Sequence, residues 1–373
     1  MTDPYDLGRA GLTELFASLG EPAYRAGQVV AWLTRGVDDP TAMTDLPAAL
    51  RHELAERFAP ARPRLLRHLI ADRGATHKFL LGLPDGEAVE AVLMLYPGRA
   101  TVCVSTQAGC AMGCPFCATG QAGFRRQLTA GEIVRQVALA HAMLVGGELE
   151  PRPRRAPDHV TNVVFMGMGE PLANLAATEA AVRWLHGEMG LGARHLTVST
   201  VGLTPGIRRL GELGLPITLA VSLHAADDAL RDDLVPINRV HPLAELLEAV
   251  DEYRRITGRR VTFEYVLIGG VNDRIEHARG LARLARRSRA HVNVIPLNPT
   301  PGVVWREPTP QATSAFVAAV QAGGAAVTLR DTRGRDVDAA CGQLLATYHL
   351  GDGRRLPVAE GAAARVDLAV VAR

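Results

Sequence analysis

The first 70 residues carry apolar side chains at the spacing of amphipathic helices. Residues 12–19, 24–36 and 46–58 place apolar residues three and four positions apart, which is the period of one helix face. Two strand-like runs then flank Pro84-Asp85-Gly86, a turn sequence that predicts a hairpin. We expect residues 1–70 to be helical, within a helical accessory domain over residues 1–74 that is joined to the rest by a β-hairpin linker over 75–95.

From residue 100 onward, short β-branched runs alternate with helical periods such as 129–145 and 243–256. This alternation predicts an α/β fold with a parallel sheet and helices outside. About six repeats are fewer than the eight of a closed barrel. We therefore expect a partial (β/α)6 TIM-like barrel over residues 96–336 and a C-terminal segment over 337–373. The predicted strands are residues 100–105, 160–166, 194–200, 216–224, 261–268, 291–297 and 325–330.

Composition and charge narrow the functional class only slightly. No apolar run approaches the roughly 18 residues of a membrane span, and the N-terminal residues show no export signal. We therefore expect a cytoplasmic protein, in which clustered cysteines suggest metal binding or catalysis rather than structural disulfides. Net charge is +2, and Lys78 is the only lysine. Arginine-rich stretches are compatible with RNA contacts but do not specify them; they cover residues 62–68, 152–157, 254–260 and 283–291.

Four of the five cysteines lie within fifteen residues, CVSTQAGCAMGCPFC. Cys110, Cys114 and Cys117 form a C-x3-C-x2-C run after the first predicted barrel strand, at the face where such folds place their active sites. Thiolates bind zinc or iron–sulfur clusters. Three thiolates on four irons leave one iron open to a substrate, whereas a structural zinc site needs four ligands. From spacing alone, Cys103 can be a fourth ligand, a strand bystander or a reagent.

The C-x3-C-x2-C run, with Phe116 before its last cysteine, resembles the signature of radical S-adenosylmethionine (SAM) enzymes. The resemblance implies that Cys110, Cys114 and Cys117 hold a 4Fe–4S cluster whose fourth iron binds the methionine part of SAM. Electron transfer, from a donor such as flavodoxin or ferredoxin, then cleaves SAM to a 5′-deoxyadenosyl radical. The family's fold is a partial (β/α)6 barrel, in agreement with the strand pattern.

Further segments fit the same resemblance. The sequence FMGMGEP, residues 165–171, resembles the family's Gly-Glu-Pro element, in which carboxylate and carbonyl oxygens would accept the SAM ammonium. Polar residues at the ends of the third, fourth and sixth strands would contact the ribose, carboxylate and adenosine of SAM. The implied SAM contacts are Gly169, Glu170, Ser199, Ser222, Leu223, His224 and Asn298.

Two cysteines remain, Cys103 and Cys341. Residues 103–128 and 332–344, with GMGEPLAN, VSLHA, VPIN and the N-terminal helical region, resemble the radical SAM RNA methyltransferases of the RlmN/Cfr group. In that group one SAM methylates the cysteine that matches Cys341, and the radical from a second SAM activates the S-methyl group for addition to adenine. The cysteine that matches Cys103 resolves the protein–RNA adduct and leaves a disulfide, which a thiol reductant must reduce. Glu90 matches a glutamate proposed as proton acceptor.

The group's substrates are 23S rRNA, at an adenosine in the peptidyl-transferase region, and tRNA, at the adenosine 3′ of the anticodon. Carbon 2 of the adenine is the expected target; carbon 8 is the alternative, since both branches of the group share the cysteines. An adenine ring carbon is not nucleophilic, so a radical cofactor is the appropriate reagent. The base must be extruded, with the helices and arginines holding the RNA. A radical SAM activase and a zinc-stabilised RNA-binding module also remain compatible with the cysteine run.

Overall fold

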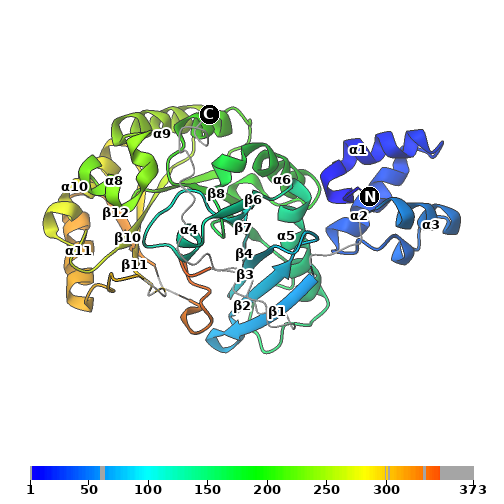
Figure 1. Cartoon of the computed structure of the whole chain (residues 1–373), viewed down its shortest axis with the longest axis horizontal. Coiled ribbons are helices and arrows are strands. Elements are labelled where there is room, and N and C mark those ends of the chain that lie inside the picture. Colours follow the sequence, from blue (N-terminus) through cyan, green and yellow to red (C-terminus); the bar gives the residue numbers. More distant parts are fainter. Residues whose placement is uncertain (1, 59–63, 299, 301–302, 331–332, 345–373) are drawn as a thin grey trace.

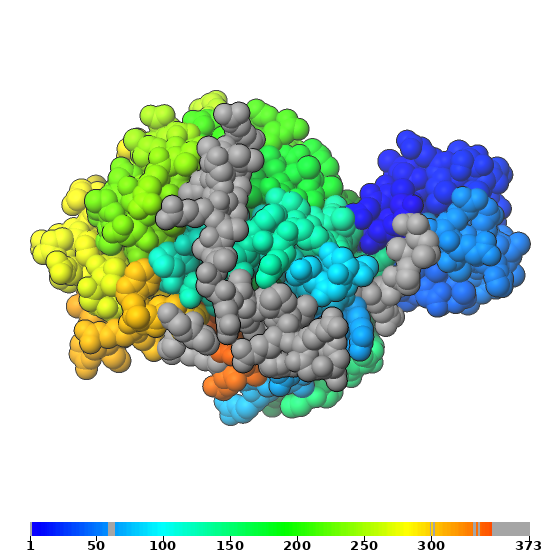
Figure 2. All heavy atoms as spheres, in the orientation of Figure 1, coloured from blue at the N-terminus to red at the C-terminus, as the bar shows by residue number. Residues whose placement is uncertain are grey.

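The computed structural model describes residues 2–58, 64–298, 300, 303–330 and 333–344. Three helices near the N-terminus form a lobe that projects from one end of the molecule (Figures 1 and 2). Their apolar faces meet around buried residues such as Leu12, Phe16 and Leu33, as the helical spacing predicts. The helices are α1 (Pro4–Ser18), α2 (Tyr24–Thr34) and α3 (Ala48–Arg57).

The lobe is docked onto α5 (Ala130–Val145) and α6 (Leu175–Gly187). Arg135 of α5 is buried and pairs with Asp3 (Nε to Oδ2, 2.8 Å) and with Asp38 of the lobe. The ring of Tyr5 packs against Trp184 of α6, with 5.2 Å between centroids. A buried ion pair and an aromatic contact thus join the lobe to the barrel.

The expectation that residues 1–70 are helical is wrong at its end. Residues Arg64–Ala71 form β1, which pairs antiparallel with β2 (Thr76–Gly82). Its leucines and isoleucine recur at a spacing that also suits a helix, but hydrogen bonding to β2 decides the conformation. β1 is a sheet edge, and Leu65 and Ile70 stay exposed. The predicted hairpin is present as β2 and β3 (Ala88–Tyr96).

Ten strands of the described chain form one sheet, in the order β1-β2-β3-β4-β7-β8-β9-β10-β11-β12. The pairs from β1 to β4 are antiparallel, and those from β4 to β12 are parallel. The sheet curves with helices along its outer rim (Figure 1), which confirms the predicted α/β partial barrel. The parallel strands are β4 (Arg99–Cys103), β7 (Asn162–Phe165), β8 (Leu196–Thr200), β9 (Thr218–Ser222), β10 (Thr262–Leu267), β11 (His291–Pro296) and β12 (Ala326–Leu329).

A small second sheet frames the loop that carries the three clustered cysteines. It pairs β5 (Gln107–Gly109) with β6 (Phe124–Gln127), and the short helix α4 (Ala118–Ala122) lies between them. In the described part of the chain, no helix is long and apolar enough to cross a membrane. The remaining helices are α7 (Thr204–Gly211), α8 (Asp228–Leu234), α9 (Leu243–Thr257), α10 (Ile275–Arg287) and α11 (Pro310–Ala322). The predicted C-terminal segment lies outside the described residues from 345 onward.

Candidate active site

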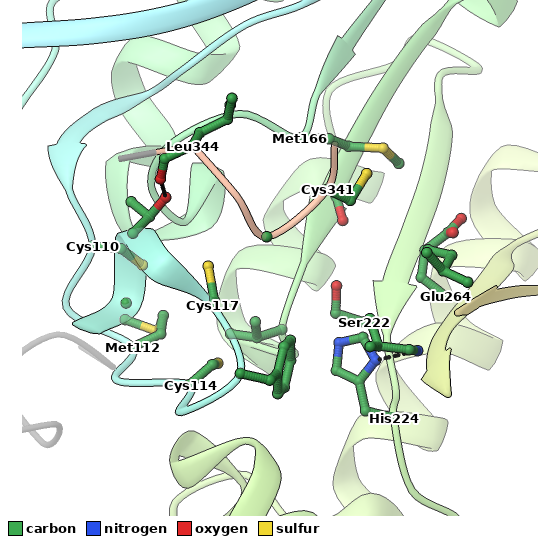
Figure 3. Close-up of a pocket in the computed structure, with 18 of the residues that line it drawn as sticks. Cys110, Met112, Cys114, Cys117, Met166, Ser222, His224, Glu264, Cys341 and Leu344 are labelled. Atoms are coloured by element: carbon green, nitrogen blue, oxygen red, sulfur yellow. Dashed lines mark hydrogen bonds between the residues drawn. The ribbon is translucent and has the colours of Figure 1, made fainter. Parts of the chain in front are cut away.

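Three cysteines lie on one side of a cavity at the carboxyl ends of the parallel strands (Figure 3). Cys110 follows β5, Cys117 immediately precedes α4, and Cys114 lies in the loop between them. The backbone N–H of Cys110 donates to the carbonyl of Gly123 (3.0 Å), and that of Cys117 to the carbonyl of Cys114 (3.1 Å). Backbone contacts therefore shape the loop and leave the three thiols to line the cavity together.

The thiols fit a metal centre by their chemistry. Burial raises the pKa of Cys110 to about 12 and that of Cys114 well above its ordinary value. Such thiols ionise when a bound metal supplies positive charge. Among the described residues, no three His, Cys, Asp or Glu side chains are close enough to hold a single metal ion. A cluster of several irons, in which each thiolate binds its own iron, suits thiols arranged around a shared cavity.

The opposite wall of the cavity holds polar residues from the ends of β8 and β9. Ser199, Ser222 and His224 line it, and Figure 3 shows Ser222 and His224 across from the cysteines. The Nδ1 atom of His224 accepts a hydrogen bond from Val266 (3.1 Å). Burial lowers the pKa of His224 to about 3, so the ring is neutral and carries its proton on Nε2. Phe116 meets this ring edge-on, 4.9 Å between centroids.

Leu223 differs from the neighbouring predicted contacts. Its side chain is fully buried in the hydrophobic core, and it is not among the described residues that line the cavity. Two hydrogen bonds hold its backbone: its N–H donates to the backbone carbonyl of Glu264 (2.9 Å), and its carbonyl accepts from Nε of Arg231 (3.1 Å). A side-chain contact from Leu223 to a ligand is therefore not supported by this arrangement.

Gly169 and Glu170 line the cavity at the turn after β7. Gly169 has φ +100°, and a Cβ there would lie 2.6 Å from Cβ of Gln107, so only glycine fits. The Glu170 carboxylate accepts hydrogen bonds from the N–H groups of Leu172 (2.9 Å) and Val201 (2.8 Å). Burial raises the pKa of Glu170 to about 7, although these hydrogen bonds act to lower it. Its remaining lone pairs can accept an ammonium group from the cavity.

Asn298 connects this cavity to the C-terminal segment. Its Nδ2 donates to the carbonyl of Cys341 (3.0 Å), while its Oδ1 is buried and has no hydrogen-bond partner among the described residues. Buried carbonyl oxygens are normally satisfied, and the amine of an adenine would satisfy this one. Two further contacts hold the segment, from the N–H of Ala118 to Gly342 (2.8 Å) and from Thr119 to Leu344.

A second, smaller cavity brings Cys103 and Cys341 together. Both cysteines line it, and Cys341 also lines the larger cavity beside the clustered cysteines. Cys103 is at the end of β4, and burial, followed by the neighbouring Cys341, raises the pKa of its thiol. Cys341 is exposed to the cavities. The fold thus places Cys341 between the clustered thiols and Cys103.

Glu90 lies on β3. It is buried, and its carboxylate pairs with Lys78, 2.8 Å from Nζ to Oε1. It is not among the described residues that line either cavity. Its β3 neighbours at the same alternation, Val92 and Met94, do line the smaller cavity, so Glu90 lies on the cavity side of the strand.

Two residues of the site were missed by sequence reasoning. Arg231 is fully buried, and its guanidinium donates to the carbonyls of Val201 (2.6 Å), Ser222 (3.2 Å) and Leu223 (3.1 Å), which fixes the ends of β8 and β9. Glu264 of β10 lines the larger cavity, and burial raises its pKa. The signal for Glu264 is a carboxylate inside an otherwise apolar strand, VTFEYVLI.

Comparison with known proteins decides the family. Residues 104–282 match the model of the radical SAM superfamily, and residues 2–59 match that of the ribosomal RNA large subunit methyltransferase N-terminal domain. A "Probable dual-specificity RNA methyltransferase RlmN" of Parafrankia sp. (strain EAN1pec) is 53% identical over 349 residues, covering 91% of each chain. The chain belongs to the RlmN family of radical SAM RNA methyltransferases. A relative of the same name from Salinispora tropica is 51% identical, in an alignment that covers 91% of this chain and 92% of the relative.

A solved structure agrees with this assignment. The crystal structure of a radical SAM methyltransferase from Sphaerobacter thermophilus superposes with a TM-score of 0.87 at 48% identity, covering 93% of this chain and 100% of that one. As a radical SAM enzyme, the protein uses a 4Fe–4S cluster and SAM. The three clustered thiols and the orphaned acceptor of Asn298 fit these groups.

Proposed function

We propose that the enzyme methylates carbon 2 of an adenosine in the peptidyl-transferase region of 23S rRNA and of the adenosine 3′ of the tRNA anticodon. We further propose that it acts on these RNAs in the cytoplasm. The observation that carries the proposal is the position of Cys341, which lines one cavity with the clustered cysteines and another with Cys103. The relatives' name, dual-specificity RNA methyltransferase, supports more than one RNA substrate.

In this proposal Cys110, Cys114 and Cys117 hold the 4Fe–4S cluster. The SAM bound beside it is contacted by Gly169, Glu170, Ser199, Ser222, the Leu223 backbone, His224 and Asn298. When bound, the cluster and two SAM molecules per turnover would supply a methyl group, a 5′-deoxyadenosyl radical and an acceptor for the electron left after addition to the base. The electron donor is a flavodoxin or ferredoxin.

Cys341 carries the methyl group in this scheme. Its thiol loses a proton and becomes an S-methyl thioether, and removal of one hydrogen atom from that methyl group lets its carbon bond to the adenine ring. The ring hydrogen at the bonding carbon leaves as a proton, for which Glu90 is the proposed acceptor. The product of this step is a covalent protein–RNA intermediate, which divides a difficult transfer into two steps.

Cys103 releases the RNA. Its thiolate attacks Cys341 Sγ and forms a disulfide, while the carbon–sulfur bond to the base breaks and its electron pair takes up a proton to give the methyl group. The two thiols share one cavity, so the exchange needs no rearrangement of the sheet. A thiol reductant then reduces the disulfide for the next turnover. The base reaches the thiols extruded from its stack, with the N-terminal lobe holding the RNA.

The test maps the product. Anaerobically reconstituted enzyme is incubated with SAM, a low-potential reductant, and ribosomal RNA or tRNA, and the modified nucleoside is identified by mass spectrometry against authentic standards. We expect 2-methyladenosine in both RNAs from the wild type, and none from Cys341→Ala, whose cluster absorbance stays unchanged. Methylation at carbon 8, or normal methylation by Cys341→Ala, would contradict the proposal.

A further inference from the structure

The only lysine of the chain, Lys78, lies in the same cross-strand row as Cys103. Lys78 on β2 is paired with Val92 on β3, which is paired with Cys103 on β4. Directly opposed residues of antiparallel strands point to the same face of a sheet. Val92 and Cys103 both line the smaller cavity, so the side chain of Lys78 leaves the sheet on the cavity side.

The Lys78 ammonium makes two contacts there. Its Nζ lies 2.8 Å from Oε1 of Glu90, with side-chain exposures of 8% and 5%. The same Nζ donates to the backbone carbonyl of Asp338 (2.9 Å). Asp338 belongs to the segment that carries Cys341. The Lys78 ammonium therefore contacts both the buried Glu90 carboxylate and the segment that carries Cys341. Lys78 itself lies in the same cross-strand row as Cys103.

Removing an ammonium and a carboxylate from water is unfavourable, and well-packed apolar residues often replace such a pair without loss of stability. Stability alone is therefore a weak reason for this pair. The position of the two contacts gives a stronger reason for the pair. Asn298 and Ala118 hold the Cys341 segment on the side of the clustered cysteines. Lys78 holds the same segment on the side of Cys103.

We propose that Lys78 is a positioning residue for the two-thiol reaction. Its hydrogen bond to Asp338 sets the approach of Cys341 to Cys103, and its ion pair with Glu90 orients that carboxylate on the same side of the sheet. This inference rests on the proposed function. Lys78 touches neither the base nor SAM in this account, and it acts through Cys341 and Glu90.

The experiment compares four variants with the wild type: Lys78→Met, Lys78→Arg, Lys78→Met/Glu90→Gln and Arg135→Met. Arg135→Met is the matched control, because it also breaks a buried ion pair but lies between the N-terminal lobe and α5. For each protein we measure S-methylation of Cys341 without RNA by peptide mass spectrometry, kcat and KM for RNA methylation, and urea unfolding.

Lys78→Met should lower kcat for RNA methylation by about 100-fold, the cost typical of a misplaced reacting group, with KM for RNA little changed. Lys78→Arg should recover most of this loss, since a guanidinium can donate to both partners. The double variant should regain stability, because no charged partner stays buried, but its kcat should remain low. Arg135→Met should lose stability while keeping wild-type S-methylation of Cys341.

Two results would overturn the inference: a Lys78→Met kcat close to that of the wild type, or a double variant in which kcat recovers together with stability. The wild-type sample separates this failure from that of the proposed function. If the wild type itself carries no S-methylcysteine at position 341, the two-thiol scheme fails and the role of Lys78 fails with it.

Discussion

Replacing Gly169 by alanine tests the packing that presents Glu170 to the cavity. A Cβ at position 169 would lie 2.6 Å from Cβ and Cγ of Gln107 and 2.8 Å from its backbone nitrogen. These are not the far end of a flexible side chain, so the backbone must move. Because Gln107 Oε1 accepts the N–H of Glu170 (2.8 Å), the movement displaces the carboxylate as well.

The loss of unfolding free energy expected for Gly169→Ala has two parts. The φ of +100° costs an L-residue about 1–2 kcal/mol, and overpacking adds about 1–3 kcal/mol. We therefore expect Gly169→Ala to lower the free energy of unfolding by about 2–5 kcal/mol. Gly190→Ala isolates the first part. Gly190 has φ +71°, and among the described residues other than its chain neighbours no atom lies within 4 Å of the point that its Cβ would occupy. This substitution should cost about 1–2 kcal/mol.

The assay is anaerobic urea unfolding of both variants, with calorimetric titration of SAM into the reconstituted proteins. Gly169→Ala should bind SAM much more weakly than the wild type, and Gly190→Ala should bind it normally. Equal unfolding free energies for the two variants, together with normal SAM binding by Gly169→Ala, would refute the packing argument.

Two further predictions concern stability alone. Burial lowers the pKa of His77 from 6.5 to about 4, so its contribution to stability is present above pH 6.5 and is lost as pH falls toward 4. His77→Gln should reduce the loss of unfolding free energy between pH 6.5 and 4, measured by urea unfolding at each pH. An unchanged pH dependence in this range would contradict the prediction. Arg135→Met should lower unfolding free energy by about 3–5 kcal/mol, whereas Arg9→Met, at an exposed pair with Glu188, should cost about 0–1 kcal/mol; equal costs would refute the burial argument.

Local signals predict most of the barrel. The helix expected over 129–145 begins after Thr129, whose side chain forms a capping box with Glu132, so its start is encoded within four residues. The strand expected over 261–268 is β10, Thr262–Leu267, because a run rich in β-branched and aromatic residues, with two arginines before it and two glycines after it, is its own signal. Residues 64–71 lack such a signal, since their pattern suits either structure and the partner strand decides.

The residues of the site likewise divide into those predicted by local sequence and those placed by tertiary contacts. The clustered cysteines and the Gly-Glu-Pro turn are contiguous motifs, so their placement around one cavity follows from the order of strands. Tertiary contacts could not be predicted: Lys78 to Asp338, Asn298 to Cys341, and the Arg231 guanidinium across two strand ends. The direction of the Leu223 side chain could not be predicted either, because a motif position does not say which way a side chain points.

The central claim is that Cys341 bonds to the RNA and Cys103 releases it. It is tested most directly by incubating anaerobically reconstituted Cys103→Ala with labelled RNA, SAM and a low-potential reductant. The products are resolved on a denaturing gel and then mapped by peptide mass spectrometry. We predict a protein–RNA adduct that resists denaturation, maps to Cys341 and is absent from the Cys103→Ala/Cys341→Ala double variant. Free methylated RNA released by Cys103→Ala at the wild-type rate would contradict the account.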